Sequence, residues 1–328
     1  MTHEDKVRRI AAMVRAASRA GIPVKFRRRS VPHFVPNPFK EGDDRPTIDI
    51  SDLTEVLRID PGSRLCVAES GVPFTDLVAA TLSHGLIPCT VPELKTITVG
   101  GAVSGCSVES MSYKLGGFHD SCLEYEVITG TGEILTCSPD HDRDAFEMIH
   151  GSYGTVALLT KLTFRLLPAK PFVRMEYRRC STFDRFWAEV CARCERDDFD
   201  FVDGIVHSPS QLVVCLGRMV DEAPYLSSYD WLEVYYKSTL ARQEDYLRLP
   251  DYFFRYDTEC HWLSRSVPVL HLEHKAVRFL LGKLLLGSTN LIRWHDRLRR
   301  LMRLKRRPEV IVDVFIPVPR FPAFWQWY

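Results

Sequence analysis

The chain has little net charge and lacks any long apolar run. Its 43 lysines and arginines are balanced by 42 aspartates and glutamates, so the formal net charge is +1. Such a chain has no overall positive potential to attract nucleic acid. No run reaches the ~18 apolar residues of a membrane-spanning helix, and the N-terminus lacks the apolar core of a signal peptide. We therefore expect a cytoplasmic protein without a nucleic-acid partner.

Signatures of several common cofactors and metals are also missing. The main glycine-rich segment is not a G-x-G-x-x-G turn and is not followed by Lys-Ser/Thr, so neither NAD nor ATP is expected there. Ten cysteines are scattered along the chain, and the C-x-x-C pair Cys191 and Cys194 has no second pair or histidine cluster to complete a zinc site. We expect free thiols, two cysteines on one helix and no metal.

The most informative segment present is residues 92–105. A β-branched run ends in Gly100-Gly101, and Gly105 follows four residues later. Glycine tolerates positive φ and has no Cβ, so successive backbone N–H groups can form a concave nest around phosphate oxygens. The segment predicts a diphosphate cradle, and the alternative is a tight glycine turn that binds nothing.

The sequence after this segment predicts a sheet. An alternating run at residues 122–128, a Thr-Gly-Thr-Gly turn and a return run at 133–137 indicate a hairpin, and the glycine-containing segment Gly151–Thr155 opens a further strand at 156–167. Here the chain resembles the FAD-linked oxidoreductases of the vanillyl-alcohol oxidase type, which have a PCMH-type FAD-binding domain, and within them the Δ24-sterol reductase (diminuto/seladin-like) family. The residues that carry the resemblance are Pro92-Glu93-Leu94, Val99-Gly100-Gly101, Gly105, Glu109-Ser110, Ser112, Lys114, Gly116, Ser152, Gly154-Thr155 and Pro168-Ala169-Lys170.

The resemblance implies an α+β fold in two parts. Residues 1–171 would form a bipartite PCMH-type FAD-binding domain of two α/β subdomains. Residues 172–328 would form a partial α+β cap that covers the flavin ring and shapes the substrate site. Family chains continue past the point where this one stops and eukaryotic members begin with a membrane-spanning segment, so we expect a C-terminally shortened relative without that segment.

The resemblance also implies the cofactor and its contacts. We expect non-covalent FAD, with NADPH as the candidate electron donor. His119 lies near the position where some superfamily members attach flavin covalently. The predicted cofactor-binding residues are Thr98, Val99, Gly100, Gly101, Ala102, Val103, Ser104, Gly105, Ser110, Gly151, Ser152, Gly154, Thr155 and Val156.

Four side chains just beyond the glycines are candidates for the proton donor of the reaction. Glu109, Tyr113, Lys114 and His119 can each transfer a proton if the pKa is tuned. Glu109 and Lys114 match the family pattern and Tyr113 does not. The alternative for Glu109 and Lys114 is that they pair with each other to hold the loop.

Three functions stay open at this point. The first is a flavin-dependent reductase of a C=C bond in a sterol or isoprenoid-like lipid, with hydride delivered from flavin N5. The second is an alcohol or hydroxy-acid oxidase or dehydrogenase on the same scaffold. The third is a catalytically silent flavin-binding protein. They differ in what reduces and reoxidises the flavin.

Periodicity outside the glycine segments predicts further elements. Val7, Ile10 and Val14 have helical spacing after Thr2 as cap, and Gly21 ends the pattern. Short strands are expected at residues 47–50 and 64–68, followed by a helix from Phe74 that ends before Gly85.

The second half is rich in aromatic residues and ends in a basic segment. Its aromatic side chains would fill the core or line the site of an elongated apolar substrate; they are Trp187, Phe199, Phe201, Tyr225, Tyr229, Trp231, Tyr235 and Tyr236. A leucine-rich stretch at 277–286 precedes an arginine cluster at 293–307. This order is typical of a helix that lies on an anionic membrane surface, and the alternative is a buried cap helix followed by a solvated basic face.

Overall fold

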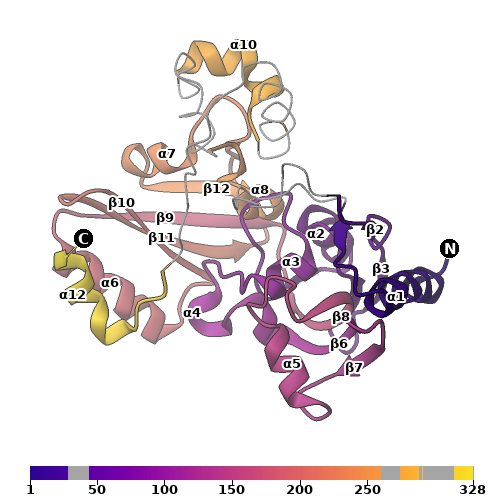
Figure 1. The fold of residues 1–328 in the computed structure, drawn as a ribbon. Coiled ribbons are helices and arrows are strands. Elements are labelled where there is room, and N and C mark those ends of the chain that lie inside the picture. Colours follow the sequence, from indigo (N-terminus) through magenta and orange to yellow (C-terminus); the bar gives the residue numbers. More distant parts are fainter. Residues whose placement is uncertain (29–43, 260–273, 288–289, 291–313, 328) are drawn as a thin grey trace.

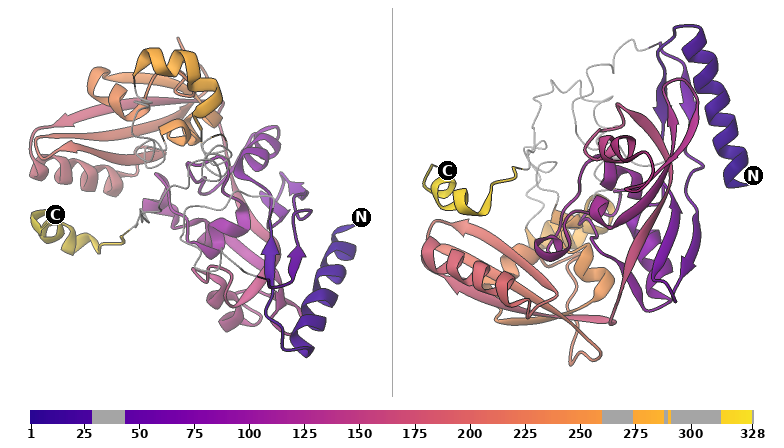
Figure 2. Two further views of the ribbon diagram at one scale, coloured as in Figure 1. Left: turned by 45° about the horizontal axis from the view of Figure 1, so that its top comes forward. Right: turned by 90° about the horizontal axis from the view of Figure 1, so that it is seen from below.

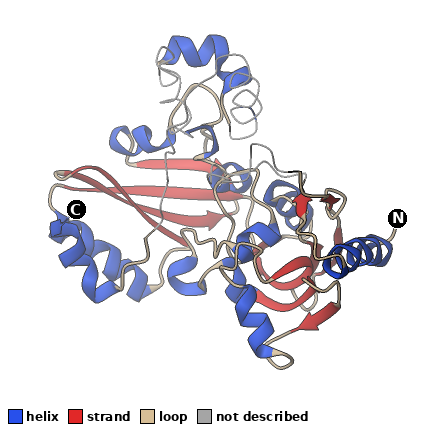
Figure 3. Ribbon diagram, in the orientation of Figure 1, coloured by secondary structure: helices blue, strands red, loops and turns tan. Residues whose placement is uncertain are grey.

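The computed structural model describes residues 1–28, 44–259, 274–287, 290 and 314–327. Within these ranges it contains two antiparallel sheets, a small parallel pair of strands and the helices that pack on them (Figures 1 and 3). The predicted α+β class is confirmed. The strands are β1 (Lys25–Arg27), β2 (Thr47–Asp49), β3 (Val56–Asp60), β4 (Leu65–Glu69), β5 (Leu86–Pro88), β6 (Cys122–Thr129), β7 (Ile134–Cys137), β8 (Ala157–Pro168), β9 (Phe172–Cys180), β10 (Phe201–Ser208), β11 (Gln211–Val220) and β12 (Glu244–Arg248).

Helices connect and cover these strands. The α-helices are α1 (His3–Arg19), α2 (Phe74–Leu82), α3 (Val99–Ser104), α4 (Ser112–Leu115), α5 (Arg143–Ile149), α6 (Phe183–Arg196), α7 (Tyr235–Ala241), α8 (Leu249–Phe253), α10 (Lys275–Leu285) and α12 (Phe321–Trp327). The 3-10 helices are η1 (Phe118–Ser121), η2 (Asp257–Glu259) and η3 (Val318–Arg320).

The first sheet has the strand order β3-β4-β8-β6-β7, and β5 also pairs with β8. The long central strand β8 is the one predicted after the second glycine segment, and the predicted hairpin is formed by β6 and β7. Aromatic rings fill the core beneath the sheet: Phe118 lies 5.1 Å from both Phe74 and Phe164, measured between ring centroids. The predicted helix from Phe74 is confirmed as α2, and Gly85 follows it with a φ of +69°.

Helix α1 docks on this sheet through apolar and ionic contacts. Thr2 caps it as predicted, and Val7, Ile10 and Val14 are buried. At its start the buried His3 lies 2.8 Å from a carboxylate oxygen of Glu69 and 2.8 Å from one of Glu126. Burial alone would lower the pKa of His3, but the hydrogen bonds to these carboxylates raise it to about 9. The imidazolium therefore ties α1 to β4 and β6.

The second sheet has the order β10-β11-β9-β12, and α6 covers part of one face. Its opposite face joins the core of the first sheet, so one apolar core extends through both. Four of the eight aromatic residues singled out in the sequence are buried in the core, which was one of the two expected roles: Phe199, Phe201, Tyr229 and Tyr235. Cys191 and Cys194 lie on one helix, α6, as predicted.

The chain passes from the first sheet to the second between Pro168 and Phe172. Figure 2 shows the two sheets side by side, with α1 at one end of the molecule and α12 at the other. The predicted domain division at residues 171 and 172 stays a prediction.

Two elements were not predicted from the sequence. Strand β3 gave no recognised signal, because its Arg58 and Asp60 interrupt the apolar pattern. The β-branched run before Gly100 leads into helix α3, which Thr98 caps and which begins at Val99. The predicted arginine cluster at 293–307 lies outside the described residues. No helix among the described residues has the length and apolar composition needed to cross a membrane.

Candidate functional site

Helix α3 carries the first predicted cofactor segment. Val99, Ala102 and Val103 face the core and are fully buried. Gly100 is a packing glycine, because a Cβ there would lie 2.7 Å from Ser70 Cβ and 2.9 Å from Ser70 O. The fold itself therefore requires Gly100.

The predicted nest of unpaired backbone amides is wrong. The N–H of Val99 donates to Val72 O (3.0 Å), and that of Gly100 to Ser70 O (2.8 Å). Within the segment, the N–H of Gly105 donates to Gly101 O (2.9 Å). These N–H groups already donate to backbone carbonyl oxygens, because the segment is a capped helix and not the loop that the glycines suggested. Binding of the cofactor by residues Thr98–Gly105 stays a prediction.

Gly101 is less constrained by packing than Gly100. A Cβ at Gly101 would lie 3.2 Å from Thr98 Oγ1, which would have to shift slightly, and would meet no atom of another segment within 4 Å. Glycine inside a helix costs about 1 kcal/mol relative to alanine, and Gly101 has no positive φ to explain its presence. The missing side chain leaves space on the outer side of α3, which fits the close approach of a ligand such as the FAD diphosphate.

The second predicted segment lies directly against the end of α3. Tyr153 N–H donates to Ser104 O (2.9 Å), and Gly151 N–H donates to Val103 O (3.3 Å). Gly151 and Gly154 have φ of +65° and +75°, and a Cβ on Gly154 would meet nothing within 4 Å. The structure thus brings together two predicted cofactor segments that are about fifty residues apart in the chain.

The remaining residues of the second segment stabilise its turn. Thr155 Oγ1 donates to Ser152 O (2.7 Å), and Ser152 Oγ accepts from Gly154 N–H (3.3 Å). Tyr153 has a φ of +51°, which is rare for a residue with a side chain. Tyr153 is 73% exposed and Val156 is 42% exposed, so this edge of the site presents apolar surface.

Glu109 and Ser110 lie where the first sheet meets the second. Val202 N–H donates to Ser110 O (3.0 Å), and the hydroxyl groups of Ser110 and Tyr252 are 2.9 Å apart. Glu109 Oε1 lies 3.6 Å from Arg255 Nη2. Ser110 was predicted to bind the cofactor, and its hydroxyl contacts the second sheet's side of the molecule.

A buried arginine cluster, which sequence reasoning missed, holds this junction. The Arg255 cluster consists of Arg255, Asp203, Tyr235, Tyr252 and Tyr256. Arg255 Nη2 lies 3.1 Å from Asp203 Oδ2, and the guanidinium carbon lies 4.2 to 5.3 Å from the centroids of the three tyrosine rings. Burial alone would lower the pKa of Arg255, but Tyr252 and the other neighbours raise it, so the guanidinium is charged.

Tyr113 and Lys114 connect helix α4 to the end of α6. Lys114 Nζ lies 2.8 Å from Asp197 Oδ1, and Tyr113 OH donates to Phe199 O (2.7 Å). Burial, together with the Asp197 carboxylate, raises the pKa of Tyr113 above its usual range. Glu109 and Lys114 do not pair with each other in the described structure, since Glu109 faces Arg255 and Lys114 faces Asp197.

His119 contacts a second histidine. Its ring centroid is 4.9 Å from that of His150, and its Nε2 is 3.6 Å from Asp120 Oδ2. Burial, followed by the charge of His119, lowers the pKa of His150, whose Nε2 is 3.0 Å from Tyr125 OH. The buried Nδ1 of His119 has no hydrogen-bond partner among the described residues.

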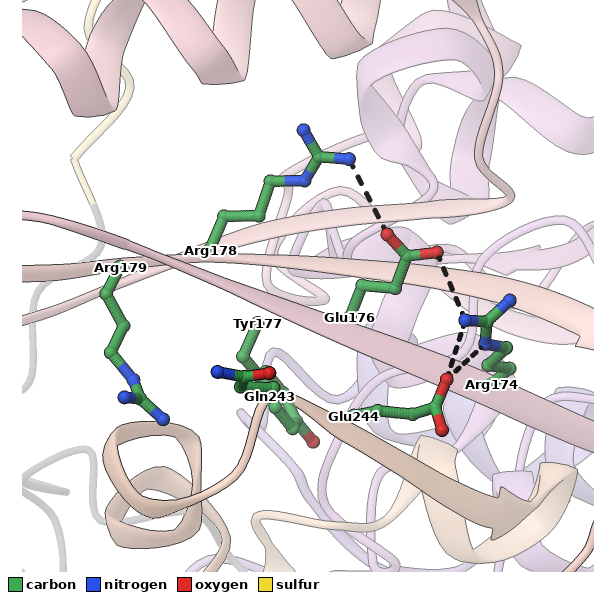
Figure 4. Close-up of a pocket in the computed structure, with 7 residues that line it drawn as sticks. All are labelled: Arg174, Glu176, Tyr177, Arg178, Arg179, Gln243 and Glu244. Carbon is green, nitrogen blue, oxygen red and sulfur yellow. Dashed lines mark hydrogen bonds and ion pairs between the residues drawn. The ribbon is translucent and has the colours of Figure 1, made fainter.

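An open polar hollow of about 460 Å³ lies elsewhere, on β9 and β12. Figure 4 shows Glu176 between Arg174 and Arg178, and Glu244 paired with Arg174. Arg174 Nη2 lies 2.6 Å from Glu244 Oε2. Because its acidic residues are paired with its arginines, this hollow is an ion-pair network on the sheet and does not belong to the glycine site.

Comparison with protein families identifies the first part of the chain. Residues 4–138 match the model of an FAD binding domain. This range contains α3 and the four candidate catalytic residues, and it ends before Gly151.

Individual relatives extend over more of the chain. The human Δ24-sterol reductase is 25% identical over 329 residues, which cover 96% of this chain and 63% of that protein. A Δ24-sterol reductase homologue of Caenorhabditis elegans is 27% identical over 238 residues, 66% of this chain and 45% of that protein. Cytokinin dehydrogenase 7 of rice is 33% identical over 161 residues, 48% of this chain and 30% of that protein. The chain thus spans less than two thirds of these relatives.

Proposed function

Because the chain belongs to the FAD-linked oxidoreductases with a PCMH-type FAD-binding domain, we propose that it reduces a C=C bond of a sterol or isoprenoid-like lipid. When bound, FAD would supply the hydride from N5, and NADPH is the proposed source of its electrons. The similarity to Δ24-sterol reductases along almost the whole chain supports this choice of reaction.

One observation supports the position of the cofactor. The outer side of α3 at Gly101 and the turn at Gly154 both leave room beside their backbones, and the Tyr153–Ser104 hydrogen bond holds the two segments together. We assign the FAD diphosphate to this place, with Gly101, Ser104, Gly105 and Gly151–Val156 as the residues nearest to it.

The candidate catalytic residues divide into two kinds on this proposal. Tyr113 and Lys114 would be positioning residues, because both are held by Asp197 and Phe199 at the end of α6. Glu109 and His119 are the two groups to test for proton delivery to the substrate carbon. A Glu109→Gln or His119→Ala variant that still accepts hydride from NADPH but no longer turns over would identify the donor.

A variant pair tests the cofactor site. Gly101→Val places branched methyls on the outer side of α3, so we expect FAD affinity to fall at least tenfold while far-ultraviolet circular dichroism stays unchanged. Gly130→Val is the matched control, because a Cβ on Gly130 meets nothing within 4 Å in the β6–β7 turn. FAD retained at wild-type stoichiometry in Gly101→Val would contradict the site.

A second candidate, favoured by the similarity to cytokinin dehydrogenases, is oxidation of a substrate on the same scaffold. The absorption spectrum of the purified protein, followed by NADPH without oxygen, separates the candidates. Bleaching of the flavin by NADPH supports the reductase, and rapid reoxidation by air after reduction by a substrate supports an oxidase. Bound flavin that neither donor reduces indicates a silent flavin-binding protein.

A further inference from the structure

Helix α10 buries an arginine and exposes large apolar side chains, unlike an ordinary surface helix. Arg278 is 1% exposed and points inward. Phe279, Leu280 and Leu284 point outward and are 61%, 77% and 56% exposed. A helix on the surface of a soluble protein normally buries its apolar side chains and exposes its charged ones.

The inward face is fixed by polar contacts to the chain just before α7. Arg278 Nε donates to Trp231 O (2.6 Å) and its Nη2 to Glu233 O (3.0 Å), while Trp231 Nε1 donates back to Arg278 O (2.9 Å). Gly282 allows this close approach, because a Cβ there would lie 2.8 Å from Trp231 Cδ1. The orientation of α10 is therefore set by a specific set of hydrogen bonds, and the apolar side chains are exposed as a consequence.

The outward face combines apolar and cationic side chains. Lys275 and Lys283 are exposed, as are Phe279, Leu280 and Leu284, and the helix contains no acidic residue. Lys283 Nζ and the Phe279 ring both lie over Trp231, at 4.9 Å and 5.5 Å from its ring centroid. Lysine amines beside large apolar groups are complementary to a surface with anionic groups above hydrocarbon.

We propose that this face of α10 docks on an anionic lipid bilayer. The apolar side chains would enter the boundary between headgroups and acyl chains, and each lysine near the headgroups would contribute about 1 kcal/mol. Figure 1 shows α10 at one extremity of the molecule. The site consists of described residues alone and does not depend on the arginine cluster at 293–307 or on the proposed reaction.

Co-sedimentation of the full chain with vesicles tests the proposal. We expect binding to vesicles of phosphatidylcholine and phosphatidylserine at low salt, release as salt screens the charges, and weak binding to phosphatidylcholine alone. The triple variant Phe279→Ser, Leu280→Ser, Leu284→Ser should reduce the bound fraction at least tenfold. The pair Lys275→Gln and Lys283→Gln should weaken binding and make it less sensitive to salt.

The matched control carries Ile134→Ser and Met148→Ser, which remove exposed apolar side chains from the first sheet's side of the molecule. It should bind vesicles like the wild type. Unchanged circular dichroism and FAD binding in the triple variant would show that the fold is intact. Wild type that stays in the supernatant, or a triple variant that binds equally well, overturns the proposal. A third outcome also overturns it. If the wild type binds no vesicles but forms a dimer in sedimentation velocity, and the triple variant is a monomer, then a second copy of the chain covers this face.

Discussion

Replacement of Arg255 by methionine should damage both stability and cofactor binding. The guanidinium is the one cation within the Arg255 cluster, and it faces Asp203 of β10 and Glu109 of the predicted active-site segment. Methionine is shorter but of similar volume and would fill most of the space. The change therefore removes the charge and the hydrogen bonds with little loss of packing.

The structure indicates how much unfolding free energy should be lost and which of the two carboxylates should be coupled more strongly to Arg255. Loss of one partner of a buried ion pair costs about 3 to 5 kcal/mol. The Asp203 and Glu109 side chains are 24% and 14% exposed, so water can solvate part of the charge left behind, and we expect about 2 to 3 kcal/mol of unfolding free energy to be lost. Because Arg255 lies 3.1 Å from Asp203 but 3.6 Å from Glu109, the coupling measured in double-mutant cycles should be larger for Asp203.

Urea unfolding and FAD titration measure the two effects separately. Arg255→Met should weaken FAD binding because Glu109, in the predicted active-site segment, loses its ion pair with Arg255. Arg242→Met is the control: Arg242 pairs with Asp245 and Glu233, which belong to the second sheet and the segment before α7, so it should lower stability and leave FAD affinity unchanged. A loss of less than about 0.5 kcal/mol for Arg255→Met, or equal loss of FAD affinity in both variants, would refute the reasoning.

Three further predictions concern α1, the β6–β7 turn and the flavin linkage. The pKa of His3 is about 9 in the folded protein against 6.5 in the unfolded chain. Its contribution to stability is therefore complete below about pH 6.5 and is lost as the pH rises through 9. The difference between the thermal unfolding midpoints of wild type and His3→Gln should shrink across this pH range. Gly132→Ala should destabilise by more than about 1 kcal/mol, since φ is +80° and a Cβ would lie 2.6 Å from Ala11 O, whereas Gly130→Ala should be nearly neutral in the same urea titration. Acid precipitation should release the yellow flavin into the supernatant, and colour kept in the pellet would indicate a covalent bond, with His119 as the first residue to replace.

Local patterns in the sequence were sufficient for several elements. The cap at Thr2, the helical spacing of α1 and α2, and the Thr-Gly-Thr-Gly turn between β6 and β7 depend on neighbours within a few residues, so the sequence could predict them. The glycine segments were predicted to be sites where the backbone approaches a ligand, and this stays a prediction. Their geometry was not predictable, because whether Val99–Gly105 forms a loop or a capped helix depends on Ser70 and Val72, which accept its N–H groups from another part of the chain.

The partners of charged side chains could not be predicted from the sequence. Glu109 and Lys114 are close in sequence and of opposite sign, yet each pairs with a partner more than eighty residues away. Burial selects such pairs, since a charge taken out of water is stabilised only by the groups that the fold places beside it.

The sequence by itself showed the resemblance to FAD-linked oxidoreductases, which the match of residues 4–138 to an FAD binding domain supports. It also determined the local helices and the hairpin, because these follow from short-range periodicity and the turn-forming property of glycine. The tertiary structure alone decided that the two glycine segments adjoin, that Arg255 holds the junction and that α10 exposes its apolar face. Each depends on hydrogen bonds or ion pairs between distant residues, and no pattern within a short window of sequence encodes which partner the fold will bring near.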